Sequence, residues 1–210
     1  MIAPTLIESA LRAWRPATVL RPGDPLHAVA VSLYRALVEA LPAALRPVTG
    51  VVLGSLEDAS QRVSVTLATP GDPVIVLSPA AVADPLRYAS TAAHEVTHAK
   101  QRDDAGFAQV AIDYVASPEL RARAEADAYA VGLWVEYLLT GSFPTTDDAV
   151  RSLSSDTYHL AAEEVELGRG VLESHLATMA AGLPPPLPVA VEALAWLRAH
   201  TPDAIGPVVR

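Results

Sequence analysis

The chain has 210 residues, a net charge of −9, 51% hydrophobic residues and no cysteine. This size and composition fit one folded domain with a full core, and they exclude disulfides and thiolate metal ligands. The negative charge, with no local cluster of Lys and Arg, argues against nucleic acid or an anionic membrane as the main partner.

Two apolar runs of the sequence can be compared with a secretory signal and with a membrane-spanning segment. The N-terminal run "MIAPTLIESALRAWRP" lacks the basic start and apolar core of a secretory signal. The later run "AYAVGLWVEYLL" is interrupted by Glu136 and is too short to span a bilayer. We therefore expect a soluble, cytoplasmic protein with no membrane partner.

The first part of the chain is predicted to hold two helices followed by short strands. Apolar residues recur at helical spacing over 4–14 and 26–41, with the turn "RPGDP" between them. Short β-branched runs follow at 51–56, 62–68 and 74–78, and "TPGDP" links the last two. These runs predict a small, mostly antiparallel sheet.

Helical periodicity returns after the strands and continues to the end of the chain. It predicts helices at about 86–102 and 118–139, one or two more within 147–181, and a last one at about 189–199. The stiff segment "GLPPPLP" precedes the last helix.

A small sheet followed by helices makes the predicted fold class α+β rather than alternating β/α. We interpret residues 1–210 as a single domain. Within it, 1–47 would form N-terminal helices, 48–140 the sheet and the helices of the functional site, and 141–210 a helical C-terminal part.

The run "TAAHEVTHAKQ" contains the pattern His-Glu-x-x-His on a predicted helix. Ring nitrogens four residues apart project from one helix face, so His94 and His98 can reach a single ion. Glu95 lies about 100° round the helix, beside that ion, where it can accept a proton from water. Zn²⁺ binds imidazole and tolerates a tetrahedral site with one open position, so zinc is the expected metal.

"HEVTH" resembles the signature of the zincin metallopeptidases, and "HEVTHAKQ" resembles short HExTHxxQ domains of uncharacterised bacterial and phage proteins. The resemblance covers about residues 74–140. It is not the metzincin pattern, which has a Gly and a third His further on. It implies the gluzincin branch, in which a glutamate of the next helix is the third ligand. It also implies a sheet edge for a peptide substrate, with "VIVLS" (74–78) as the candidate strand.

The downstream run "RARAEADAYAVG" offers two carboxylates as the third ligand. Resemblance to the gluzincin form E-x-E-A-Y-A selects Glu125. Asp127 lies on an apolar face of the same helix, where a carboxylate needs a partner. It could bind the metal itself, accept a hydrogen bond from His94 or His98, or cap another group.

A donor to the developing oxyanion is also needed for peptide hydrolysis, and Tyr129, Tyr158 and His159 are the candidates. His175, by contrast, lies on a helix face that looks exposed, and we expect it to be solvated.

The predicted function is that of a zinc-dependent metallopeptidase acting on a peptide or protein, with Glu95 as general base. The alternative is a noncatalytic zinc-binding or protein-interaction module. In that case the N-terminal helices or the Pro-rich C-terminal arm would contact a protein partner.

Overall fold

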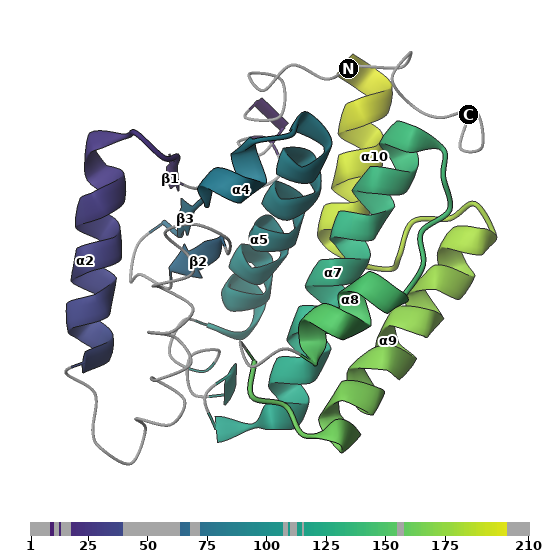
Figure 1. The fold of residues 1–210 in the computed structure, drawn as a ribbon. Coiled ribbons are helices and arrows are strands. Elements are labelled where there is room, and N and C mark those ends of the chain that lie inside the picture. The colour runs from purple at the N-terminus through teal and green to yellow at the C-terminus, as the bar shows by residue number, and fades with distance from the viewer. Residues whose placement is uncertain are drawn as a thin grey trace.

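The computed structural model combines a small sheet with a larger group of helices (Figure 1). It describes residues 9–10, 13, 18–39, 64–67, 72–106, 109, 113–114, 116–154 and 158–200. The strands in these ranges are β1 (Thr18–Leu20), β2 (Val65–Leu67) and β3 (Val74–Val76). The helices are α2 (Pro25–Glu39), α4 (Pro79–Val82), α5 (Pro85–Ala105), α7 (Pro118–Thr140), α8 (Asp147–Leu153), α9 (Ala162–Ala180) and α10 (Pro188–His200).

The α+β class predicted from the sequence is confirmed, and α2, α5, α7 and α10 lie within a few residues of their predicted positions. Two helices, α8 and α9, occupy the segment for which one or two were expected. The predicted strand at 51–56 and most of the predicted helix at 4–14 lie outside the described residues. None of the helices within the described ranges has an apolar run long enough to cross a membrane.

The described sheet is mixed, so the prediction of a mostly antiparallel sheet was wrong. The strand order is β1-β3-β2, with β1 parallel and β2 antiparallel to β3. A helix-containing connection lets two strands run parallel, and α2 lies between β1 and β3 in the chain. Because β3 is paired on both sides, it is not the edge expected at 74–78, and the edges among the described strands are β1 and β2.

Side-chain caps fix where α5 and α7 begin. The carboxylate of Asp84 accepts a hydrogen bond from the backbone nitrogen of Arg87, and the hydroxyl of Ser117 accepts one from Leu120. A proline follows each cap, and its fixed φ suits the first helical position. Gly141 ends α7 in the left-handed region, at φ 71°.

The closest helix packing is between α5 and α7, which present small side chains to each other. Ala92 and Ala93 on α5 and Ala126 and Ala130 on α7 are fully buried in one hydrophobic cluster. Small residues allow helix axes to approach closely. Gly132 on α7, opposite Ser90 on α5, belongs to the same line of small residues between the two helices, which we call the seam. The alanine face of the His-Glu-x-x-His helix is therefore buried.

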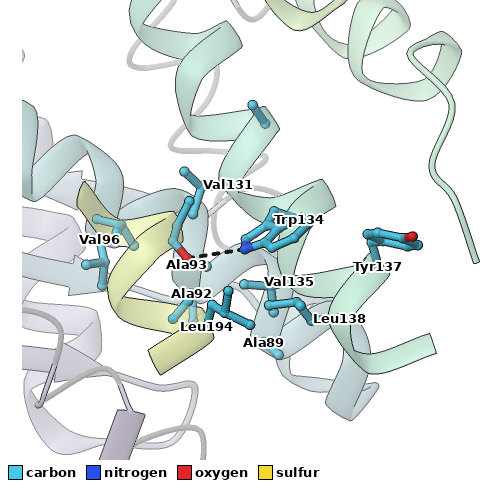
Figure 2. Packing of buried hydrophobic residues seen from close by; sticks show 14 of the residues in the cluster. Ala89, Ala92, Ala93, Val96, Val131, Trp134, Val135, Tyr137, Leu138 and Leu194 are labelled. Carbon is cyan, nitrogen blue, oxygen red and sulfur yellow. Dashed lines mark hydrogen bonds between the residues drawn. The ribbon is translucent and has the colours of Figure 1, made fainter. Parts of the chain in front are cut away.

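Larger side chains close the seam at its end (Figure 2). Trp134 is fully buried, and its indole N–H donates to the carbonyl oxygen of Ala190 at the start of α10, 3.2 Å away, the dashed line in Figure 2. Val135, Leu138 and Leu194 pack around it in the same cluster. The indole thus fixes α10 against the two central helices.

Gly132→Ala is expected to destabilise the protein, although alanine favours a helix interior by about 1 kcal/mol over glycine. An added Cβ would lie 3.0 Å from the Ser90 hydroxyl and 3.2 Å from its carbonyl oxygen, so Ser90 and the part of α5 that carries it would have to shift by a few tenths of an ångström. The matched control is Gly170→Ala on α9, where the Cβ meets no atom within 4 Å. Chemical denaturation should show Gly170→Ala at or above the parent stability and Gly132→Ala below it; equal gains in both variants would contradict the tight seam.

Candidate metal centre

His94, His98 and Glu125 converge where α5 crosses α7. The two Nε2 atoms of the histidines lie 3.1 Å apart. His94 Nε2 lies 3.4 Å from Glu125 Oε2, and His98 Nε2 lies 3.3 Å from Glu125 Oε1. Ligand atoms at about 2.0–2.1 Å from a tetrahedral zinc ion are about 3.3–3.4 Å apart, and each histidine nitrogen lies about that far from one of the two carboxylate oxygens. With one ligand atom taken from each side chain, all three lie within 4.8 Å of one another. In the described part of the chain, this is the one group of three such side chains placed to hold a metal.

The Glu125 carboxylate is almost fully buried, with 2% of the residue exposed. Tyr114 donates a hydrogen bond to Oε1 at 2.6 Å. Oε2 is also buried but has no hydrogen-bond partner among the described residues. Burying a carboxylate oxygen without a partner is costly, and a cation between the three side chains would remove that cost. The residues present therefore fit a divalent metal.

Gln101 determines which nitrogen of His98 faces the centre. Its amide nitrogen donates to the carbonyl oxygen of Ala124 on α7 at 3.0 Å, which turns its amide oxygen towards His98. That oxygen lies 2.9 Å from Nδ1 of His98 and accepts its proton. When the ring is neutral, Nε2 keeps its lone pair directed at the centre, as a metal ligand requires. The HExTHxxQ resemblance includes this glutamine, but the sequence does not reveal its role.

The charges of His98 and Glu125 stabilise each other when no metal is bound. Burial alone would lower the pKa of His98, but the carboxylate of Glu125, helped by Glu95, outweighs burial and raises that pKa to about 9. Burial alone would raise the pKa of Glu125, but His98 and His94 hold it well below its ordinary value. The metal-free centre therefore holds a proton on His98 in the place of a cation.

Glu95 follows His94 and is also buried, with 4% of the residue exposed. The hydroxyl of Thr66 on β2 lies 2.7 Å from its Oε2 and 2.9 Å from its backbone carbonyl oxygen. Thr66 thus links the edge strand to the turn of α5 that carries the centre. A single threonine in a strand carries no sequence signal for such a role, and it was not predicted.

Two of the three predicted oxyanion donors lie beside the centre. The ring of Tyr129 packs edge-on against His94, with centroids 4.6 Å apart, and its hydroxyl lies 3.0 Å from that of Tyr158. Burial and the charge of Glu125 raise the pKa of Tyr129 to about 12, and the same two causes raise that of Tyr158 well above its ordinary value. Both phenols therefore keep their protons at neutral pH.

His159 is placed differently from the two tyrosines. Its residue is exposed, its backbone adopts a left-handed conformation with φ 47°, and its carbonyl oxygen accepts a hydrogen bond from Arg121. The structure gives its ring no contact with the three ligand residues. The contact of His159 with α7 is therefore made by its backbone.

Asp127 has a partner, but not one of the two histidines considered from the sequence. Its Oδ1 lies 2.8 Å from Nε2 of His175, which joins α7 to α9. His175 is buried, so the expectation that it is solvated was wrong. Helix periodicity showed that Asp127 faces apolar neighbours, but not that α9 would bring a histidine to it. An open hollow of about 520 Å³ beside this pair contains none of the three ligand residues.

No protein-family model matches the chain, and no match is found among curated proteins or solved structures. The chemistry of the centre is therefore inferred from its residues and their geometry.

Glu125→Gln is expected to weaken zinc binding by more than the roughly 10–100-fold that loss of an outer hydrogen-bond partner costs. His94→Ala and His98→Ala should abolish retention of zinc, while Asp127→Asn, whose partner is His175, should bind zinc like the parent. Competition with a chromogenic chelator measures these affinities. A loss in Asp127→Asn as large as that in Glu125→Gln would move the third ligand to Asp127.

Zinc binding at pH 7 is expected to release about one proton from His98, because a metal ligand must be the neutral imidazole. With the pKa of the metal-free His98 at about 9, the proton that this ring gives up should disappear as the pH rises through 9, whereas ionisation of metal-bound water begins near pH 7 and adds to the release at higher pH. An NMR titration of the imidazole ring of His98 in the metal-free protein separates the two contributions. A ring that is already neutral at pH 7 would contradict the charge assignment.

Proposed function

We propose that the protein is a zinc-dependent metallopeptidase on a zincin-like scaffold. His94, His98 and Glu125 would hold Zn²⁺, and Glu95 would act as the general base. The observation that carries the proposal is the convergence of three side chains, whose nearest nitrogen and oxygen atoms lie 3.1–3.4 Å apart, with a buried carboxylate next in sequence to the first of them. A site that serves only to hold a metal has no need of that carboxylate.

Zn²⁺, when bound, would supply a Lewis acid for the scissile carbonyl and would lower the pKa of a water molecule towards about 7. Glu95 would take a proton from the attacking water as its oxygen bonds to the carbonyl carbon, and would pass that proton to the amide nitrogen as the C–N bond breaks. Thr66 supports this role because its hydroxyl donates to Oε2 and fixes the orientation of the carboxylate. The base is then held in place before substrate arrives.

The developing negative charge on the carbonyl oxygen needs a donor, and the Tyr129–Tyr158 pair supplies one. In a pair of hydroxyls 3.0 Å apart, one donates and the other accepts, so the accepting phenol can direct its own proton to the substrate. The raised pKa values of both groups keep that proton in place. Tyr158 is our choice for the donor, because Tyr129 packs its ring against His94.

A noncatalytic module remains the second candidate, and the Thr66 contact is the observation that favours it. A buried Glu95 that accepts a threonine hydrogen bond could simply tie β2 to α5. In that case the carboxylate contributes to stability, and zinc would be retained for folding or for a protein partner. The two candidates differ in what Glu95 is needed for.

Glu95→Gln is expected to keep zinc and the folded structure but to lose peptide hydrolysis by about 10²–10⁴-fold, because only the proton acceptor is removed. Glu173→Gln, an exposed site on α9, is the matched control for loss of one negative charge. Cleavage of a broad library of unfolded peptides and the zinc content per chain are measured on the same samples.

Undiminished cleavage by Glu95→Gln would remove Glu95 as the base. A parent protein that binds zinc fully and cleaves nothing in the library would favour the noncatalytic module.

A further inference from the structure

Arg121 is a buried arginine on α7, one helical turn before Glu125, with 5% of the residue exposed. Its guanidinium donates to three backbone carbonyl oxygens: Nη1 to Tyr114 at 2.6 Å, Nε to Tyr158 at 2.9 Å and Nη2 to His159 at 3.4 Å. The planar guanidinium presents several donors in fixed directions, which a lysine does not. Arg121 therefore joins two separate segments of the chain to α7.

Each of these two segments carries a tyrosine whose hydroxyl contacts Glu125 or Tyr129. Tyr114 precedes α7 and donates to Glu125, while Tyr158 lies between α8 and α9 and contacts Tyr129. Desolvating a guanidinium is costly, and hydrogen bonds from its nitrogens to carbonyl oxygens reduce that cost. A residue four positions before Glu125 lies on the same face of α7, so Arg121 and the ligand face the same side.

Tyr114 forms hydrogen bonds through both its backbone and its side chain. Its carbonyl oxygen accepts from Arg121, and its hydroxyl donates to Oε1 of Glu125 at 2.6 Å. Oε1 also lies 3.3 Å from Nε2 of His98, while Oε2 has no hydrogen-bond partner among the described residues and lies 3.4 Å from Nε2 of His94. The orientation of the ligand carboxylate thus follows from the position of Tyr114, which follows from Arg121.

We propose that Arg121 and Tyr114 are positioning residues that orient Glu125 for the metal, Arg121 acting through the backbone of Tyr114 and Tyr114 through its hydroxyl. Their contribution is to metal affinity, and it rests on the metal site of the proposed function but not on peptidase activity. Outer hydrogen-bond partners of metal ligands typically contribute 10–100-fold to affinity.

The test is a double-mutant cycle on the Zn²⁺ dissociation constant of the full chain, with variants Tyr114→Phe, Arg121→Lys and the two combined. Tyr114→Phe should weaken Zn²⁺ binding by about 10–100-fold. Arg121→Lys should weaken it by a similar or smaller factor, and the double variant should be no weaker than Tyr114→Phe, because Arg121 acts through Tyr114. The absorption of the Co²⁺-loaded protein should shift in all three, since the ligand carboxylate turns.

Two substitutions on α7 serve as controls. Arg123→Lys changes an exposed arginine two residues away, and Tyr137→Phe removes a phenol three turns beyond Glu125. Both should bind Zn²⁺ like the parent. Thermal unfolding of the metal-free proteins is measured alongside, so that a loss of stability is separated from a loss of affinity.

An unchanged dissociation constant in Tyr114→Phe would overturn the proposal, whether or not Arg121→Lys folds. An Arg121→Lys variant that melts at a lower temperature but binds Zn²⁺ normally would also overturn it. The same holds if the losses of Zn²⁺ affinity in the two single variants add up in the double variant. If the parent binds zinc but cleaves no peptide, the peptidase proposal fails while the cycle still decides on the positioning residues.

Discussion

The distance between α5 and α7 determines whether the proposed ligands can share a metal ion, because His94 and His98 belong to one helix and Glu125 to the other. Ligand atoms must lie within about 0.2 Å of their ideal distances from an ion, a tolerance much finer than ordinary side-chain packing requires. Ala92 and Ala126, together with Gly132, bring the two helices close enough without bulky side chains between them. The sequence composition of the seam is thus a condition for the chemistry at its end.

Local spacing made part of this centre predictable. The separation of His94 and His98 by one helical turn depends only on helix geometry, and the caps of α5 and α7 confirm helices where periodicity predicted them. Glu125 was selected by resemblance, and the structure brings it to the two histidines.

What the sequence could not predict depends on contacts between distant segments. The partner of Asp127 is a histidine 48 residues away on α9, and the partner of Glu95 is Thr66, 29 residues upstream. β1 has only three residues, too few for a recognisable pattern, and it gains its place by pairing with β3. Tyr114 and Arg121 belong to no recognisable sequence motif, because their proposed role depends on a contact that forms only in the folded chain.

Gln101 contacts both helices of the seam at once. Its amide nitrogen is held by the carbonyl oxygen of Ala124, the residue before Glu125, and its oxygen fixes the ring of His98. A rotation of α7 that displaced Glu125 would also move Ala124, release the glutamine and free His98 to turn or change tautomer. Two ligands from different helices are then lost in a single event. Metal release would accordingly be cooperative, with few intermediates in which the ion is held by some of its ligands.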